Sequence, residues 1–205
     1  MYRVSRLDAL RASVARLIAP PALLHDRLHI CGLIRVREVP FATEDEWRMW
    51  WLCERDSRGR IIRPARMSDR EKARYTVAES PNILVSGGIT QVLNYVGSQS
   101  GNSIGFAQYF AVGNIGITQV TSADTSVAGE YFRAVPSTAS VSGTQQDISV
   151  FAGTTQANGS ITNAGLFGNG ATSTLGSGTL MTHSLFQYTK TNSNAVTFDY
   201  LLSYV

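Results

Sequence analysis

The sequence predicts a mainly β protein: an antiparallel β-sandwich or jelly-roll-like C-terminal domain with a short leading helix, preceded by a small α+β N-terminal anchoring region. Residues 1–80 hold 16 of the 18 Lys and Arg residues and 11 of the 15 Asp and Glu residues. Residues 81–205 hold only six charged residues and show short alternating apolar runs separated by turn residues, which is typical of antiparallel sheets. We therefore expect two domains, 1–80 and 81–205.

The first part predicts one helix and two strands before residue 54. Apolar residues recur at helical spacing over 5–19, where Ser5 caps the predicted helix and two prolines follow it. Residues 28–39 alternate between apolar and polar positions, which predicts a strand. We expect a second strand over 46–53, the segment EWRMWWLC.

That segment contains all three tryptophans of the chain. In a strand, neighbouring side chains point to opposite faces, so the three rings cannot all enter one small core. Trp and Arg are frequent anchors of protein interfaces, and arginines follow the tryptophans closely. We therefore predict a partner-docking set, with a Trp-lined core as the open alternative: Trp47, Trp50, Trp51, Arg55, Arg58, Arg60 and Arg63.

The rest of the first part predicts a hairpin or linker and a short helix. Residues 54–66 are highly charged and suit a hairpin tip or linker. Ser68 followed by Glu71 three residues later has the spacing of a capping box, which predicts a helix start. Proline at position 81 disfavours helix at the residue before it, so we expect that helix to end there and place the domain boundary after residue 80.

From residue 81 the sequence predicts one helix and then strands. The helix covers about 88–96, and the Asn-Gly pair at 158–159 predicts a tight hairpin. The predicted strands are 106–112, 130–135, 146–152, 160–167, 179–188 and 195–204.

Catalytic and cofactor motifs are absent from the sequence. It contains no GxSxG nucleophile motif, no P-loop and no GxGxxG after a strand. The second part offers one histidine, His183, and few charged groups from which an active site could be assembled. We therefore predict a protein that is not an enzyme and binds no cofactor.

Zinc is one open possibility, because His25, His29, Cys31 and Cys53 are zinc-type ligands. The sequence has no CxxC pair, however, and the predicted strand makes a shared helical face for the two histidines implausible, so we predict no metal site. Two cysteines make no disulfide framework, and no run approaches the ~20 apolar residues of a membrane helix. We expect synthesis in the cytoplasm and no membrane partner.

The dense arginine run at 55–66 raises the possibility of nucleic-acid binding by charge. Glu54 and Asp56 interrupt the run, and no zinc-finger, RRM or helix-turn-helix signature accompanies it. We therefore rank nucleic acid below the other classes of partner.

Several short motifs in 81–205 resemble a broad group of tailed-bacteriophage virion proteins, often described as tail-fibre-like. The matching pieces are AVG at 111–113, ITNAGLF at 161–167, GTLM at 178–181 and YTK at 188–190. The chain departs from the group at Asn163, where Glu is frequent, and at Asn114, where the group continues Gly-Thr-Gly. The resemblance does not extend to residues 1–80.

The resemblance implies a structural component of a tailed-phage virion, made in the host cytoplasm and assembled as a homo-oligomer with other virion proteins of the tail or capsid. We expect a tail-associated short fibre or fibre-anchoring protein. A capsid decoration or cement protein is the alternative. A host-surface carbohydrate-binding module is a further alternative, and it would need exposed aromatic rings such as Tyr131, Phe132 or Tyr188.

Overall fold

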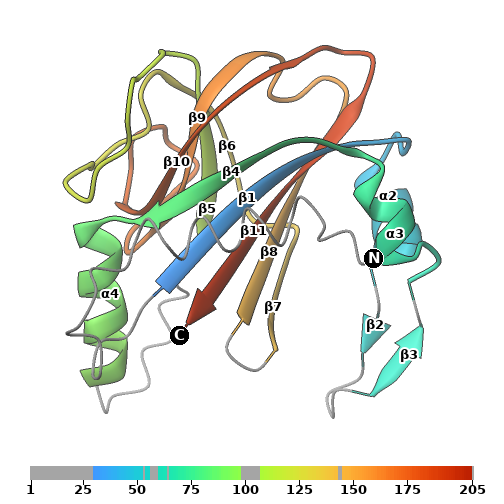
Figure 1. The fold of residues 1–205 in the computed structure, drawn as a ribbon, viewed down its shortest axis with the longest axis horizontal. Helices are drawn as coiled ribbons and strands as arrows, with labels where there is room; N and C mark the ends of the chain where they lie inside the picture. The colour runs from blue at the N-terminus through green and yellow to red at the C-terminus, as the bar shows by residue number, and fades with distance from the viewer. Residues whose placement is uncertain are drawn as a thin grey trace, which may run out of the picture.

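A computed structural model describes residues 30–52, 54–55, 60–63, 65–97, 107–142 and 145–204. The described chain is mainly antiparallel β, which confirms the predicted fold class. Nine strands form one sheet in the order β6-β5-β9-β10-β4-β1-β11-β8-β7, and the short strands β2 and β3 form a separate hairpin (Figure 1). The predicted helix at 5–19 lies outside the described residues.

The strands of the large sheet are β1 (Ile30–Val39), β4 (Thr76–Leu84), β5 (Tyr109–Gly113), β6 (Glu130–Ala134), β7 (Thr138–Ser142), β8 (Gln145–Ala152), β9 (Gly159–Gly168), β10 (Thr179–Lys190) and β11 (Ala195–Tyr204). The hairpin consists of β2 (Glu54–Arg55) and β3 (Ile61–Arg63). The helices are α2 (Glu44–Trp51), α3 (Asp69–Ala73) and α4 (Ser86–Gly97).

The large sheet curls around its own core. Phe110 on β5 lies with its ring centroid 4.7 Å from that of Phe198 and 5.8 Å from that of Tyr200, both on β11. Four strands separate β5 from β11 in the sheet order, so only a strong curl can bring these rings together. The described strands therefore make one curled sheet, and a sandwich of two separate sheets is not confirmed.

The predicted domain boundary after residue 80 falls inside a strand. β4 continues through Pro81, which pairs with Leu33 of β1. Proline has no N–H to give to a neighbouring strand. Here the Ser80 hydroxyl donates instead to the Leu185 carbonyl at 2.5 Å, and the Ser184 hydroxyl donates to the Pro81 carbonyl at 2.7 Å. β1 and β4 lie in the middle of the sheet, so the described parts of both predicted domains share one sheet.

The segment predicted as a strand over 46–53 is helical instead. Thr43 accepts a hydrogen bond from the Glu46 amide, and the Glu46 carboxylate accepts one from the Thr43 amide, which together form a capping box. Trp47 and Trp51 are four residues apart and so share the buried face of α2. The strand prediction was wrong because the tryptophan run hid this helical spacing.

The predicted helix start at Ser68 is confirmed by α3, with the expected capping box between Ser68 and Glu71. The predicted end at residue 80 was wrong, because α3 ends at Ala73 and the strand β4 begins at Thr76. The predicted helix around 88–96 is confirmed as α4. Its first turn packs directly on β10: a Cβ atom at Gly88 would lie 2.2 Å from the Met181 carbonyl oxygen. Glycine is therefore required at this position by close approach of two backbones.

Two predictions about turns and strands were wrong. β8 and β9 flank the Asn158-Gly159 pair but are not neighbours, because β8 pairs with β11 and β7 whereas β9 pairs with β5 and β10. The connection between them is therefore a crossing loop and not a hairpin. β7 was not predicted at all, since its sequence TASVS is made of small residues with little apolar contrast.

Candidate functional site

The three tryptophans of the predicted docking set occupy different environments. Trp47 and Trp51 are buried in a small secondary core between α2, α3 and the end of the sheet. Trp47 lies 5.8 Å from the ring centroid of Phe151, and Trp51 meets Tyr75 edge-on at 6.0 Å. These two residues are therefore core residues and not surface anchors.

Trp50 lies on α2 beside the buried face that Trp47 and Trp51 share, and it is 42% exposed. The Arg66 guanidinium lies over its ring, 4.9 Å from the centroid, and Met49 beside it is 39% exposed. We call Met49, Trp50 and Arg66 the Trp50 surface. Trp, Arg and Met are each enriched in protein interfaces.

The predicted docking arginines are only partly described. Arg55 and Arg63 belong to the β2–β3 hairpin, which extends away from α2 and α3 in Figure 1. Their side chains, and the whole of Arg58, lie outside what the structure describes, whereas Arg60 is exposed. Of the four arginines in this set, Arg60 is therefore the one whose side chain is placed, and it lies at the surface.

A second candidate site lies on the solvent-facing side of the sheet. One row of paired residues runs across five neighbouring strands and is polar throughout: Glu79, Arg35, Asp199, Ser149 and Thr138. The Arg35 Nε donates to Glu79 at 2.5 Å, and the Ser149 hydroxyl donates to Asp199 at 2.6 Å. Arg37, from the next row, forms an ion pair with Asp199.

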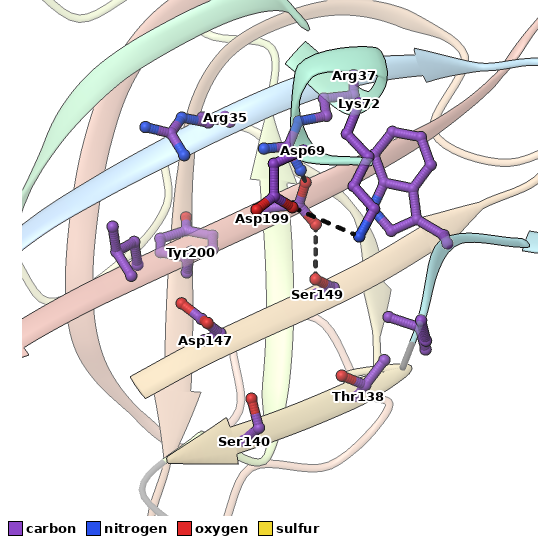
Figure 2. A pocket seen from close by; sticks show the side chains of 13 residues that line it. Arg35, Arg37, Asp69, Lys72, Thr138, Ser140, Asp147, Ser149, Asp199 and Tyr200 are labelled. Carbon is purple, nitrogen blue, oxygen red and sulfur yellow. Dashed lines mark hydrogen bonds and ion pairs between the residues drawn. The ribbon is translucent and has the colours of Figure 1, made fainter. Parts of the chain in front are cut away.

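Four of these strands, β1, β11, β8 and β7, and the ends of α2 and α3 line an open cavity of about 240 Å³, which we call the polar pocket (Figure 2). Asp147 of β8 lies in it, and burial together with the Asp199 carboxylate raises the pKa of Asp147 above its usual value, against the opposing effect of Arg35 and Arg37. This pocket was not predicted from the sequence, since its lining residues come from four strands and the ends of two helices. The only indication of it in the sequence was the predicted strand at 28–39, whose polar face includes Arg35 and Arg37.

In the other half of the sheet, His183 on β10 contacts other polar side chains in a buried cluster. Its Nδ1 lies 2.6 Å from the Asp124 carboxylate and its Nε2 lies 3.2 Å from the Asn163 side-chain oxygen. Burial acts to raise the pKa of Asp124, but two hydrogen bonds from Thr121 and the contact with His183 outweigh it and lower that pKa below its usual value. His183 is only 2% exposed and its second nitrogen faces an amide, so this pair is arranged as a structural link rather than as a base beside a nucleophile.

Asn163 fastens the loop between β5 and β6 to the sheet. Its side-chain oxygen accepts a hydrogen bond from the Ala128 amide at 2.9 Å, and its nitrogen donates to the carbonyls of Ala128 and Ile115. Lys190 does the same for the loop after β8, because its ammonium group donates to Asn158 and to the Thr154 carbonyl. The two motif residues thus hold loops in place.

The aromatic residues required for the carbohydrate-binding alternative are packed against the main core. Tyr131 donates a hydrogen bond to the Ala157 carbonyl, and burial raises the pKa of Tyr131 to about 12. Tyr188 donates to the Glu38 carboxylate at 2.8 Å, and Phe132, like the two tyrosines, packs against the main core. They do not form an exposed aromatic platform.

In the described part of the chain, no group of three His, Cys, Asp or Glu side chains is placed to hold a metal ion. Three of the four predicted zinc-type ligands, His25, His29 and Cys53, lie outside this part, and Cys31 is described in its backbone alone. None of the described helices has the length and apolar character needed to cross a membrane.

Comparisons of the chain with protein-family models, with curated proteins and with solved structures find no match.

Proposed function

We propose that this chain is a structural component of a tailed-phage virion, either a tail-associated short fibre or a fibre-anchoring protein. The proposal starts from the sequence motifs shared with tail-fibre-like virion proteins. It also rests on the low charge of residues 81–205, because a surface with few charges suits repeated packing against neighbouring subunits.

The observation that carries the proposal is the position of the motifs in the fold. The pieces at 111–113 and 161–167 belong to β5 and β9. Those at 178–181 and 188–190 belong to β10, apart from Gly178, which directly precedes it. These three strands are direct neighbours in the sheet, although the motifs span about 80 positions of sequence. Short motifs that assemble on adjacent strands are what a shared structural unit would require, whereas chance matches would be scattered over the fold.

The Trp50 surface is the proposed contact with the particle. Trp50 belongs to α2, which lies on the same side of the molecule as the β2–β3 hairpin and on the side away from α4 (Figure 1). A second surface for assembly is the edge strand β7, since its sequence TASVS lacks the charged residues and prolines that usually protect an edge from pairing. This edge supports the expectation of a homo-oligomer.

The proposal is tested by incorporation into particles. Phage carrying Trp50→Ala should contain at least about tenfold less of the chain than wild-type particles, because an interface anchor of this kind contributes about 2 kcal/mol or more. Ile89→Ala, which removes another exposed apolar side chain far from this surface, is the matched control and should leave incorporation unchanged. Equal incorporation of all three forms would rule out the Trp50 surface, and absence of the wild-type chain from particles would rule out the virion role.

A further inference from the structure

A buried contact between His183 and Asp124 joins the sheet to residues 114–129, the loop that connects β5 to β6. The His183 Nδ1 atom lies 2.6 Å from the Asp124 carboxylate, and its Nε2 atom lies 3.2 Å from the side-chain oxygen of Asn163. The His183 side chain is 2% exposed and that of Asp124 is 23% exposed. Water has little access to the ring, so these two side chains must satisfy both of its nitrogens.

The backbone around Asn163 allows only one orientation of its amide group. The oxygen accepts a hydrogen bond from the Ala128 amide at 2.9 Å, while the nitrogen donates to the carbonyls of Ile115 at 3.2 Å and Ala128 at 3.0 Å. Exchanging the oxygen and the nitrogen would set two donors against each other and an oxygen against two carbonyl oxygens. The atom that faces the His183 Nε2 is therefore an oxygen, which accepts hydrogen bonds and donates none.

The Asp124 carboxylate is also an acceptor. The Thr121 amide donates to it at 2.9 Å and the Thr121 hydroxyl at 2.6 Å. Burial acts to raise the pKa of Asp124, but these two bonds and the contact with His183 hold that pKa below its usual value. The carboxylate is therefore ionised at neutral pH and has no proton to donate to the His183 Nδ1.

Both ring nitrogens of His183 thus face atoms that only accept hydrogen bonds. A neutral histidine carries a proton on one nitrogen, so either tautomer would direct a lone pair at an oxygen. We propose that His183 carries a proton on both nitrogens, and that this imidazolium holds residues 114–129 against the sheet as a pH-sensitive latch. Loss of one proton in alkaline solution removes one of the two hydrogen bonds and the attraction to Asp124, so the loop opens more often. This inference does not depend on the virion role.

Asp124 is the charged group that faces His183 from the elements packed around it. It is the one charged residue of the loop, and β5, β9 and α4 contain none. The other ionisable side chains of the surrounding strands have contacts of their own: Glu79 with Arg35, Glu130 with Arg133, Tyr109 with Arg133, Lys190 with Asn158, and Tyr131 and Tyr188 with the main core. The charge on His183 therefore depends on Asp124.

The test is a nitrogen-15 NMR spectrum of the histidine rings in the full chain. The double variant His25→Gln/His29→Gln keeps His183 as the single histidine and assigns its signals in the wild-type spectrum. At about pH 7.5, an unperturbed histidine is about nine-tenths neutral. Under these conditions both nitrogens of His183 should still carry protons. The spectrum of a neutral tautomer, with one unprotonated nitrogen, would overturn the proposal.

A pair of variants tests the dependence on Asp124. Asp124→Asn should leave the His183 ring neutral at about pH 7.5, because the carboxylate that stabilises the charge is gone. Asp45→Asn removes an exposed carboxylate on α2 and is the matched control, so its His183 ring should remain doubly protonated. A doubly protonated ring in Asp124→Asn would overturn the assignment of the ion pair.

Hydrogen exchange of the loop amides tests the latch itself. The protection of the Thr121 and Ala128 amides, corrected for the intrinsic effect of pH on exchange, should fall about tenfold as the His183 ring loses a proton. The Phe198 amide, on β11 between β1 and β8, should keep its protection over the same range. Constant protection of the loop while the ring titrates would overturn the latch, and so would a ring that keeps both protons until the protein unfolds.

Discussion

Within one short helix, Trp50 and Trp51 occupy opposite environments. Trp51 is 3% exposed and packs against Phe41 and Tyr75, whereas Trp50 faces solvent beneath Arg66. Trp51→Ala should lower the free energy of unfolding by about 3–5 kcal/mol, because it empties a packed core position. Trp50→Ala should change it by less than about 1 kcal/mol. Chemical denaturation followed by circular dichroism measures both, and equal losses for the two variants would contradict these assignments.

Tyr200 and Tyr188 differ in whether the side-chain hydroxyl has a hydrogen-bond partner, so they can be compared directly. The Tyr200 hydroxyl is buried without a hydrogen-bond partner among the described residues, whereas the Tyr188 hydroxyl donates to Glu38. Tyr200→Phe should leave the free energy of unfolding unchanged or raise it by up to about 1 kcal/mol, because an unsatisfied buried group is removed. Tyr188→Phe should lower it by about 1–2 kcal/mol. A loss with Tyr200→Phe as large as that with Tyr188→Phe would show that Tyr200 has a partner.

The lowered pKa of Asp124 predicts a dependence of stability on pH. A carboxyl group whose pKa is lower in the folded state stabilises the fold above its unfolded pKa, and this contribution disappears as the pH falls through the folded value. The difference in unfolding free energy between wild type and Asp124→Asn should therefore shrink between about pH 5 and pH 2.5. A difference that stays constant or grows on acidification would show that Asp124 is not held in its charged form.

At the scale of elements, the capping box of α2 explains why this segment is a helix. Thr43→Ala should lower the free energy of unfolding by about 1 kcal/mol, because the Glu46 amide loses its acceptor. Ser193→Ala, in an exposed turn where the described structure shows no bond from the hydroxyl, is the control and should change it by less than about 0.5 kcal/mol. Thermal unfolding of the two variants measures this difference. An unchanged midpoint for Thr43→Ala would contradict a stabilising role for the Thr43 cap.

The elements also show what the sequence can predict. Strands such as β1 and β11 were predicted because their alternation reflects one buried and one solvent-facing side. α2 was mistaken for a strand because a short run rich in aromatic residues does not by itself separate the helical period from the strand period, and the capping box at Thr43 and Glu46 was the deciding signal. The polar pocket could not be predicted, because register between distant strands decides which side chains meet.

At the scale of the whole molecule, the fold predicts that residues 81–205 do not form an independent domain. Such a fragment lacks β1 and most of β4, which separate β10 from β11 in the sheet. The fragment should show no cooperative unfolding transition, whereas the fragment 30–205 should show one. A folded 81–205 fragment with dispersed amide signals would restore the two-domain organisation predicted from charge.

The central claim is that this chain is a virion protein, and its location in the particle tests the claim most directly. Purified particles would be separated into heads and tails, and each fraction would be blotted for the chain. We expect the chain to be recovered with the tails, in a ratio to the major tail protein that is constant between preparations. Recovery with the heads alone would contradict the tail assignment and favour the capsid decoration alternative, and absence from both fractions would contradict the virion role itself.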